Sequence, residues 1–353
     1  MVENMNLLHR QTAKIVTFGE LLLRLASLGY TKLFQKDNLE TSFCGSEANV
    51  AVSLAIFGLD SSFVSILPDT DIGHAAENYM RYFGVDTSKV LYRDGRMGLY
   101  YLEKGASQRP SKVIYDRKYS ALSLAESKDF NWEVIFDGAD WFHWSGINPA
   151  LSDELAEISL EACKKAKEKG MIVSCDLNYR SKLWSSQKAQ EVMKPIMKYI
   201  DICICNEEDA ENVLGIKAKG SNVAAGKLNE SSYIRTAELI HEKFGCKYIA
   251  TTLRKSYSAS RNGWSAMLYD AKTDNTFFSR EYDIQIVDRV GGGDSFGAGL
   301  IYALSSGMGG QSAIEFAAAA SCLKQTIEGD FNRCTVRDVE ILLKNGGNGR
   351  VQR

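Results

Sequence analysis

The chain lacks a strong excess of either charge. Its 42 lysine and arginine residues are balanced by 44 aspartate and glutamate residues, which leaves a formal net charge of −2 over 353 residues without a long run of either sign. This balance excludes a basic groove for nucleic acid or a polybasic patch for anionic membranes as the basis of function. We expect small-molecule partners, with no nucleic acid and no membrane among them.

Long apolar runs and clustered cysteines are missing as well. No stretch reaches 18 apolar residues, and residues 1–14 have no apolar core of signal-peptide length. The eight cysteines include no CxxC pair and no cluster with histidine at metal spacing. Cys203 and Cys205 alternate in an apolar segment, which favours free thiols on one buried strand face over metal ligands. These absences predict a cytoplasmic protein with reduced thiols.

Short apolar segments alternate with helical patterns along the chain. We expect strands at 14–20, 61–67, 139–146, 171–177, 201–206 and 247–253, with helices at 46–58 and 152–170. This order predicts one α/β domain over 14–345, with a mostly parallel central sheet covered by helices on both faces in three α/β/α layers.

Two segments interrupt this alternation. Residues 21–44 and 90–122 lack long helical periodicity and are rich in aromatic residues, glycine and alternating polar residues. They predict extended strands that form a small β-rich lid, placed where open parallel sheets bind ligands. Because the edges of such strands often pair, a homo-oligomer through the lid is a further expectation.

A glycine-rich segment, VDRVGGGDSFGAG at 287–299, follows a strand-like stretch and opens a helical pattern. Neither GxxxxGK[ST] nor a strand followed by GxGxxG occurs, so the two common phosphate loops are absent and a dehydrogenase is disfavoured. Glycines at a helix N-terminus still favour anion binding, because the backbone N–H groups there are unpaired and no side chain blocks access to them. Taken alone, the motif is more typical of Asp294 as a helix N-cap after a tight turn.

Several segments together resemble the PfkB/ribokinase family of carbohydrate kinases. The segment DRVGGGDSFGAG is similar to the family signature Asp-Thr-x-Gly-Ala-Gly-Asp-x-Phe-x-x-Gly, with Arg289 in place of threonine and Gly292 in place of alanine. The stretch 43–85 is similar to the N-terminal pattern of the family. Within the family, GELLLRL, GSEANVAV, CDLNYRSKLW and the signature resemble the 2-keto-3-deoxygluconate kinases. The resemblance runs from about residue 14 to 330.

The resemblance implies a ribokinase-like fold and ATP-dependent phosphorylation of 2-dehydro-3-deoxy-D-gluconate to its 6-phosphate, with ATP and Mg²⁺ as cofactors and an acidic sugar as substrate. A kinase of a neutral sugar or nucleoside is the alternative within the same class. A sugar or nucleotide sensor that kept the fold but lost catalysis is the alternative from another class. An intact run from Gly291 to Asp294 argues against the sensor.

The resemblance also assigns catalytic and sugar-binding roles. Asp294 would accept the proton of the sugar hydroxyl, and the backbone N–H groups of the glycines would stabilise the transferred phosphoryl group. The catalytic set is Asp294, Gly291, Gly292 and Gly293. The substrate set is Gly45, Asn49, Tyr100, Arg180 and Asp294, in which Arg180 would bind the carboxylate through two parallel hydrogen bonds.

Departures from the family pattern affect the acidic end of the sugar. Leu102 stands where many relatives carry a second arginine, so Arg109 or Arg117 would have to replace it. Arg24 lies near the place of a hydroxyl-binding aspartate in ribose kinases and argues against a neutral ribose-like substrate. Ser46 is typical of a helix N-cap.

On the nucleotide side, the resemblance points to Asn206, Thr252, Arg254, Ser256, Gly291 and Gly293. The segment 251–260 lacks the usual glycine of the nucleotide turn, so Arg254 could equally be a solvated loop cation. Asp209 would hold Mg²⁺ through water, although an acidic residue in a first helical turn is also favoured by the helix dipole.

Overall fold

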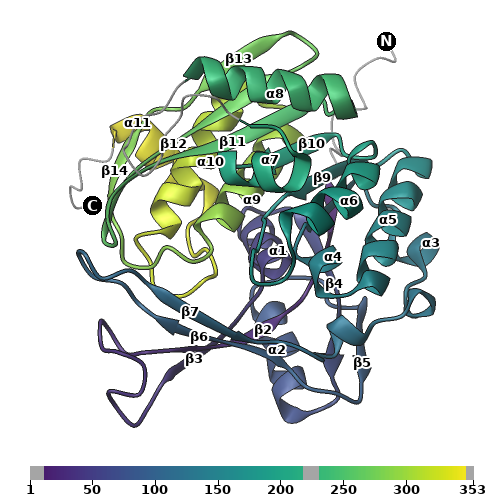
Figure 1. The fold of residues 1–353 in the computed structure, drawn as a ribbon, viewed down its shortest axis with the longest axis vertical. Helices are drawn as coiled ribbons and strands as arrows, with labels where there is room; N and C mark the ends of the chain where they lie inside the picture. The colour runs from purple at the N-terminus through teal and green to yellow at the C-terminus, as the bar shows by residue number, and fades with distance from the viewer. Residues whose placement is uncertain (1–11, 218–229, 347–353) are drawn as a thin grey trace, which may run out of the picture.

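A ten-stranded sheet forms the centre of the protein, as seen in a computed structural model that describes residues 12–217 and 230–346 (Figure 1). The strand order is β13-β12-β11-β10-β9-β8-β1-β4-β5, with β14 paired to β12. The neighbours from β11 to β5 are parallel and only the β12 pairs are antiparallel, which confirms a mostly parallel sheet. The strands are β1 (Lys14–Phe18), β4 (Asp60–Pro68), β5 (Val90–Arg93), β8 (Trp141–Ser145), β9 (Ile172–Asp176), β10 (Ile202–Cys205), β11 (Tyr248–Ser258), β12 (Arg261–Asp270), β13 (Asn275–Phe278) and β14 (Tyr282–Gln285).

Helices cover both faces of this sheet, as the alternation predicted. Ile15 and Val16 are neighbours on β1, yet they belong to separate apolar cores because successive strand residues face opposite sides. The core of Ile15 is closed by α1 (Ser46–Ile56), α9 (Gly292–Ser305), α10 (Gly310–Lys324) and α11 (Val336–Asn345). The core of Val16 is closed by α5 (Asp153–Glu168), α6 (Ser186–Met197), α7 (Glu207–Leu214) and α8 (Glu230–Phe244). The shorter or peripheral helices are α2 (Asp71–Tyr82), α3 (Trp132–Ile135) and α4 (Asn148–Leu151).

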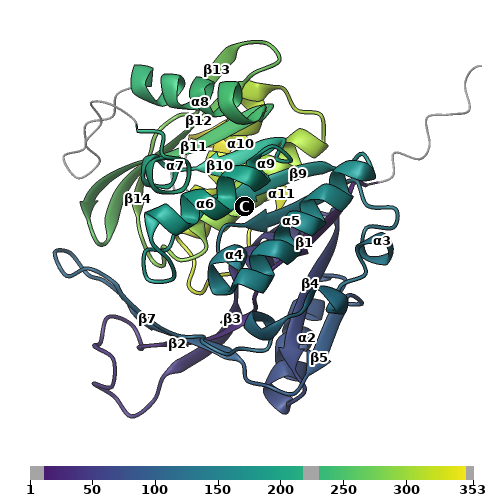
Figure 2. The same ribbon diagram turned by 45° about the vertical axis from the view of Figure 1, so that its right-hand side comes forward.

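A second, four-stranded sheet lies apart from the main body, at the lower left of Figures 1 and 2. Its order is β3-β2-β6-β7, built from β2 (Leu22–Ala26), β3 (Glu40–Cys44), β6 (Gly98–Glu103) and β7 (Lys112–Asp116). We call it the small sheet. Extended strands outside the main sheet are thus confirmed, but β5 pairs with β4 of the main sheet. The start of the 90–122 segment was therefore wrongly assigned, because a short strand of alternating residues can add to either sheet edge.

The eight cysteines are free, and Cys203 and Cys205 are buried in the same apolar core. Their predicted place on one strand face is confirmed. Within the part of the chain that the structure describes, no helix combines the length and the apolar composition needed to cross a membrane.

Candidate active site

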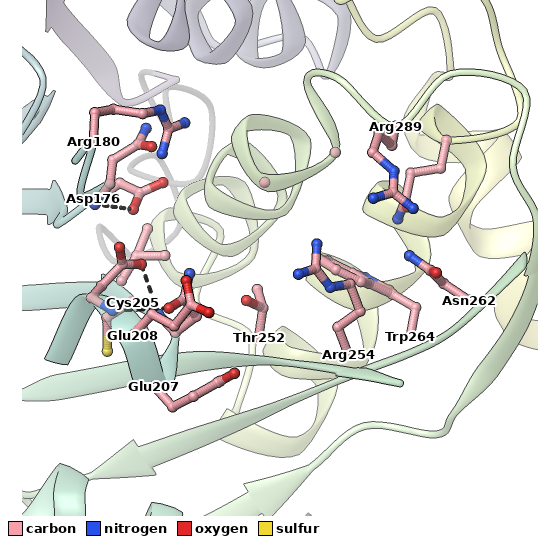
Figure 3. Close-up of a pocket in the computed structure, with 17 residues that line it drawn as sticks. Asp176, Arg180, Cys205, Glu207, Glu208, Thr252, Arg254, Asn262, Trp264 and Arg289 are labelled. Atoms are coloured by element: carbon pink, nitrogen blue, oxygen red, sulfur yellow. Dashed lines mark hydrogen bonds between the residues drawn. The ribbon is translucent and has the colours of Figure 1, made fainter. Parts of the chain in front are cut away.

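Two cavities meet where the carboxyl ends of the central strands face the small sheet. The small-sheet cavity, of about 330 Å³, is lined by Cys44, Gly45, Asn49, Tyr100, Tyr115 and Asp294 among others. The α7 cavity, of about 250 Å³, is lined by Asn206, Thr252, Arg254, Asn262 and Trp264 among others (Figure 3). Both are lined by Asp176, Asn178, Arg180, Arg289 and Gly293, which we call the junction. Carboxyl ends of parallel strands are where such sheets bind ligands.

Asp294 lies in the first turn of α9, at the wall of the small-sheet cavity. Its carboxylate accepts hydrogen bonds from Ser46 Oγ at 2.8 Å and from Asn49 Nδ2 at 2.6 Å. Burial raises the pKa of Asp294 to about 6, while these two donors oppose the rise. The group is thus oriented and still ionised at neutral pH, with a pKa suited to a general base.

Ser46 differs from expectation. The N-cap of α1 is Gly45, and Ser46 uses its hydroxyl to hold Asp294 rather than to cap its own helix. A β-carbon at Gly45 would lie 2.0 Å from the carbonyl oxygen of Glu20, so this position requires glycine for close approach of two backbones. The expected sugar ligand Asn49 also turns its amide towards Asp294. The first turn of α1 therefore positions the carboxylate of Asp294.

The three glycines before Asp294 serve different purposes. Gly291 has φ +80°, and a β-carbon there would lie 2.1 Å from the carbonyl oxygen of Asp330. Gly292 donates its N–H to the carbonyl of Arg289 at 3.2 Å, so that donor is already engaged. A β-carbon at Gly293 would meet no atom within 4 Å, and this residue opens onto both cavities. Its N–H, together with that of Asp294, lies in the unpaired first turn of α9.

A matched pair of substitutions separates these roles. Gly293→Ala should leave thermal unfolding near that of the wild type and lower turnover roughly 10-fold or more, because the new methyl enters the space beside the anion-binding N–H groups. Gly291→Ala should lower the free energy of unfolding by about 2 kcal/mol, since the backbone there is left-handed and crowded. Differential scanning calorimetry and steady-state kinetics on both variants test this. Full activity of Gly293→Ala would place the anion site elsewhere.

Tyr100 and Arg24 contribute to one buried network. The Tyr100 hydroxyl donates to Asp330 at 2.7 Å, so its ring lines the cavity while its polar end is engaged. Arg24 is buried between Asp288, at 2.5 Å, and Asp330. Arg24 is thus engaged within the protein and lines neither cavity, so it makes no direct contact that would select the sugar. Arg24 instead anchors the small sheet to the loop that carries Asp294.

Arg180 follows β9 after a reversal of the chain at Asn178, whose φ is +43°. Its Nη1 donates to the carbonyl of Tyr179 at 3.0 Å, and no carboxylate among the described residues pairs with it. By contrast, Arg117 is paired with Glu20 and Arg109 with Glu103. Arg117 lines the small-sheet cavity, whereas Arg109 lies outside both cavities. Arg180 is thus the sequence-predicted cation best placed for a ligand anion.

Sequence reasoning missed Tyr115. Three residues of β7 and its end, namely Val113, Tyr115 and Arg117, line the small-sheet cavity together. Their spacing of two is the alternation of a strand, which places all three on one face. The alternation is visible in the sequence, but the resemblance points to the neighbouring strand around Tyr100.

On the nucleotide side, Asn206 caps α7 by accepting the N–H of Asp209 at 2.9 Å. Thr252 and Arg254 line the α7 cavity with it. Ser256 does not, because β11 continues beyond the expected end at 253 to Ser258 and pairs with β12. The longer hairpin carries Ser256 out to an exposed position outside the cavity lining, and its nucleotide role stays a prediction.

Carboxylates accumulate on one side of the α7 cavity. Burial, together with the negative charges of Asp209 and Asp294, raises the pKa of Asp176 well above its usual range. The oxygens of Asp209 accept the N–H groups of Tyr179, at 2.9 Å, and of Asn206, at 3.0 Å. Residues 12–217 and 230–346 contain no cluster of three or more side chains arranged to hold a metal. Such excess negative charge fits Mg²⁺ held mainly through water and phosphate, and the role of Asp209 stays a prediction.

The chain is similar to known proteins along most of its length. A model of the "pfkB family carbohydrate kinase" matches residues 12–332. A 2-dehydro-3-deoxygalactonokinase of Haloferax volcanii is 31% identical, with 96% of this chain and 99% of that protein covered. The crystal structure of a 2-dehydro-3-deoxygluconokinase from Thermotoga maritima is 49% identical, with a TM-score of 0.90 and coverage of 94% and 99%. A PfkB family carbohydrate kinase from Listeria grayi is 31% identical, with a TM-score of 0.85 and coverage of 92% and 98%. The chain belongs to the pfkB family of carbohydrate kinases and has their ribokinase-like α/β fold.

Proposed function

We propose that this kinase transfers the γ-phosphoryl group of ATP to the terminal hydroxyl of 2-dehydro-3-deoxy-D-gluconate and forms the 6-phosphate. The observation that carries the proposal is Arg180, whose guanidinium lies at the junction and forms no ion pair within the described chain, although its charge acts on Asp176, Asp209 and Asp294. A planar guanidinium matches a carboxylate through two parallel hydrogen bonds. The names of the Thermotoga maritima and Haloferax volcanii relatives support an acidic 2-keto-3-deoxy sugar.

In this mechanism the sugar occupies the small-sheet cavity and ATP the α7 cavity. Ser46 and Asn49 hold the Asp294 carboxylate, which accepts the proton of the sugar hydroxyl. The hydroxyl oxygen then bonds to the γ-phosphorus in line with the bond that breaks to ADP, while the first-turn N–H groups of α9 donate to the phosphoryl oxygens. Mg²⁺, which Asp176 and Asp209 would hold through water, would neutralise phosphate charge when bound.

An ADP-release assay over a panel of sugars tests the substrate. The expected result is a kcat/KM for 2-dehydro-3-deoxy-D-gluconate about 30-fold or more above that for fructose, ribose and a nucleoside, because these lack the carboxylate that Arg180 would bind. The galactonate epimer belongs in the panel, since it differs only at one hydroxyl-bearing carbon. Preference for a neutral sugar would reject the proposal. Absence of ADP release with every sugar would favour a sensor without catalysis. We do not expect this result, because Asp294 is held in an orientation suited to a base.

We also propose that residues 14–345 act as one domain whose small sheet closes over the sugar, and that this sheet pairs in a homo-oligomer. β7 is an outer strand of the small sheet and leaves Ile114 41% exposed, with Tyr119 62% exposed just beyond it. Edge strands with apolar side chains favour association. The buried free thiols support a cytoplasmic location, where thiols stay reduced.

Light scattering after size exclusion tests the association. The wild type should elute as an oligomer, and Ile114→Asp should shift it towards the monomer because a charge replaces the apolar contact. Glu40→Asp, on the opposite edge strand β3, serves as the matched control. A monomeric wild type would contradict the proposal.

A further inference from the structure

Arg289 is the junction residue for which the mechanism above has no use. It lines both cavities, and its position in the signature is usually threonine. Its Nη2 makes one long hydrogen bond to the carbonyl of Ala259, at 3.3 Å, and its Nε is buried without a partner. No carboxylate in the described ranges forms an ion pair with it. Burying a guanidinium whose N–H groups lack acceptors costs free energy, unless a ligand accepts hydrogen bonds from them.

The surroundings of Arg289 add positive charge rather than remove it. Burial lowers the pKa of Arg289, and the charge of Arg254 lowers it further. Arg254 also lacks an ion-pair partner in the part of the chain described. Figure 3 shows both arginines on one side of the α7 cavity, across from Glu207 and Glu208. The charge of Arg254 is felt by Glu207 across the cavity, but neither arginine forms an ion pair with a described carboxylate. Two like charges held together in this way form a site for an anion.

The backbone points to the same place. The carbonyl of Arg289 accepts the N–H of Gly292 at 3.2 Å, which removes one of the donors that the glycine loop would offer to a phosphoryl group. The free N–H groups of the Arg289 side chain are on the same loop and reach the junction. Arg289 therefore occupies one backbone donor of the loop with its carbonyl group and supplies charged donors from its side chain.

We propose that Arg289 contacts the phosphoryl group during its transfer, while Arg254 binds the phosphates that remain on ADP. The two arginines are given these different roles because Arg289 lines both cavities, whereas Arg254 lines only the α7 cavity. As the sugar oxygen bonds to phosphorus and the bond to the ADP oxygen breaks, the proton passes to Asp294 and charge on the phosphoryl oxygens is balanced by Arg289. This inference rests on the proposed kinase function.

The test compares Arg289→Thr with Arg254→Thr. Turnover of Arg289→Thr should fall about 10²- to 10³-fold, as for loss of one preorganised donor. Calorimetric titration should show ADP affinity unchanged in Arg289→Thr, and affinity for a non-hydrolysable ATP analogue reduced about 10-fold, since only the analogue carries the third phosphate. Arg254→Thr should lose affinity for both nucleotides. Arg289→Lys should recover part of the lost turnover, because it restores the charge without the fork of donors.

Other outcomes overturn the inference. Arg289→Thr with turnover within about 3-fold of the wild type, or with ADP affinity reduced as much as in Arg254→Thr, would place Arg289 away from the transferred group. A fall in thermal stability that Arg289→Lys fully repairs, with no difference between the two nucleotides, would make its role structural. The titrations need no sugar, so they remain decisive even if the sugar panel rejects the proposed substrate.

Discussion

Replacing Asp294 by asparagine should reduce turnover about 10²- to 10⁴-fold while ATP still binds. Asparagine keeps the size of the side chain but cannot accept the hydroxyl proton. Because Ser46 and Asn49 donate to the carboxylate, the variant also loses part of the orientation of this group. Steady-state kinetics with calorimetric nucleotide titration measure both effects. Asp116→Asn is a control, since Asp116 is an exposed partner of Arg96 on the small sheet.

The same assignment predicts the pH profile. The pKa of Asp294 is raised to about 6, and a general base works only when ionised, so kcat/KM should level off about one pH unit above 6, be half-maximal near pH 6 and fall further at lower pH. Two of the other carboxyl groups that line this cavity also have raised pKa values. Burial raises the pKa of Glu47 to about 7 and that of Asp176 well above its usual range. Because the acid limb is assigned to Asp294, the variants Glu47→Gln and Asp176→Asn should still show it near pH 6.

Two results would remove Asp294 from the role of base. One is a variant Asp294→Asn that retains most of its turnover. The other is an acid limb that disappears in Glu47→Gln while it persists in the remaining activity of Asp294→Asn. Either would assign proton acceptance to another group of the small-sheet cavity.

The second large effect concerns specificity. Arg180→Ala should cost about 2–5 kcal/mol of binding to the acidic sugar, because the substrate carboxylate is left buried without its charged partner. The Michaelis constant for 2-dehydro-3-deoxy-D-gluconate should rise about 30-fold or more, whereas that for ATP should change little. Measurements of kcat/KM for the acid and for fructose in both proteins test this. Arg109→Ala is the matched control, since Arg109 pairs with Glu103 outside both cavities.

An equal loss for the acid and for fructose would show that Arg180 serves the phosphates or the fold. Arg180 lines both cavities, so the α7 cavity is the physical alternative. The carboxylate would then be bound by Arg117, whose charge is already shared with Glu20, or by backbone amides.

Local patterns in the sequence were enough for the central fold. The predicted helices at 46–58 and 152–170 correspond to α1 and α5, since their apolar spacing and end signals act within a few residues. In α5, Ser152 accepts the N–H of Leu155 and Lys165 lies in the last turn. Local patterns were insufficient where an extended segment had more than one possible neighbour. This explains why β5 was assigned to the wrong sheet and why the predicted strand at 247–253 is shorter than β11.

By itself, the sequence determined the alternation of strands and helices in the central sheet and the glycine run before Asp294, because both depend on residues that are close along the chain. Only the tertiary structure decided which charged side chains are free to act. Arg24 and Asp288 are 264 residues apart, yet they form a buried ion pair, whereas Arg180 and Arg289 form no ion pair with a carboxylate in the described residues. Pairing depends on distances between remote segments, and a guanidinium that is neutralised by a protein carboxylate is no longer available to a substrate anion.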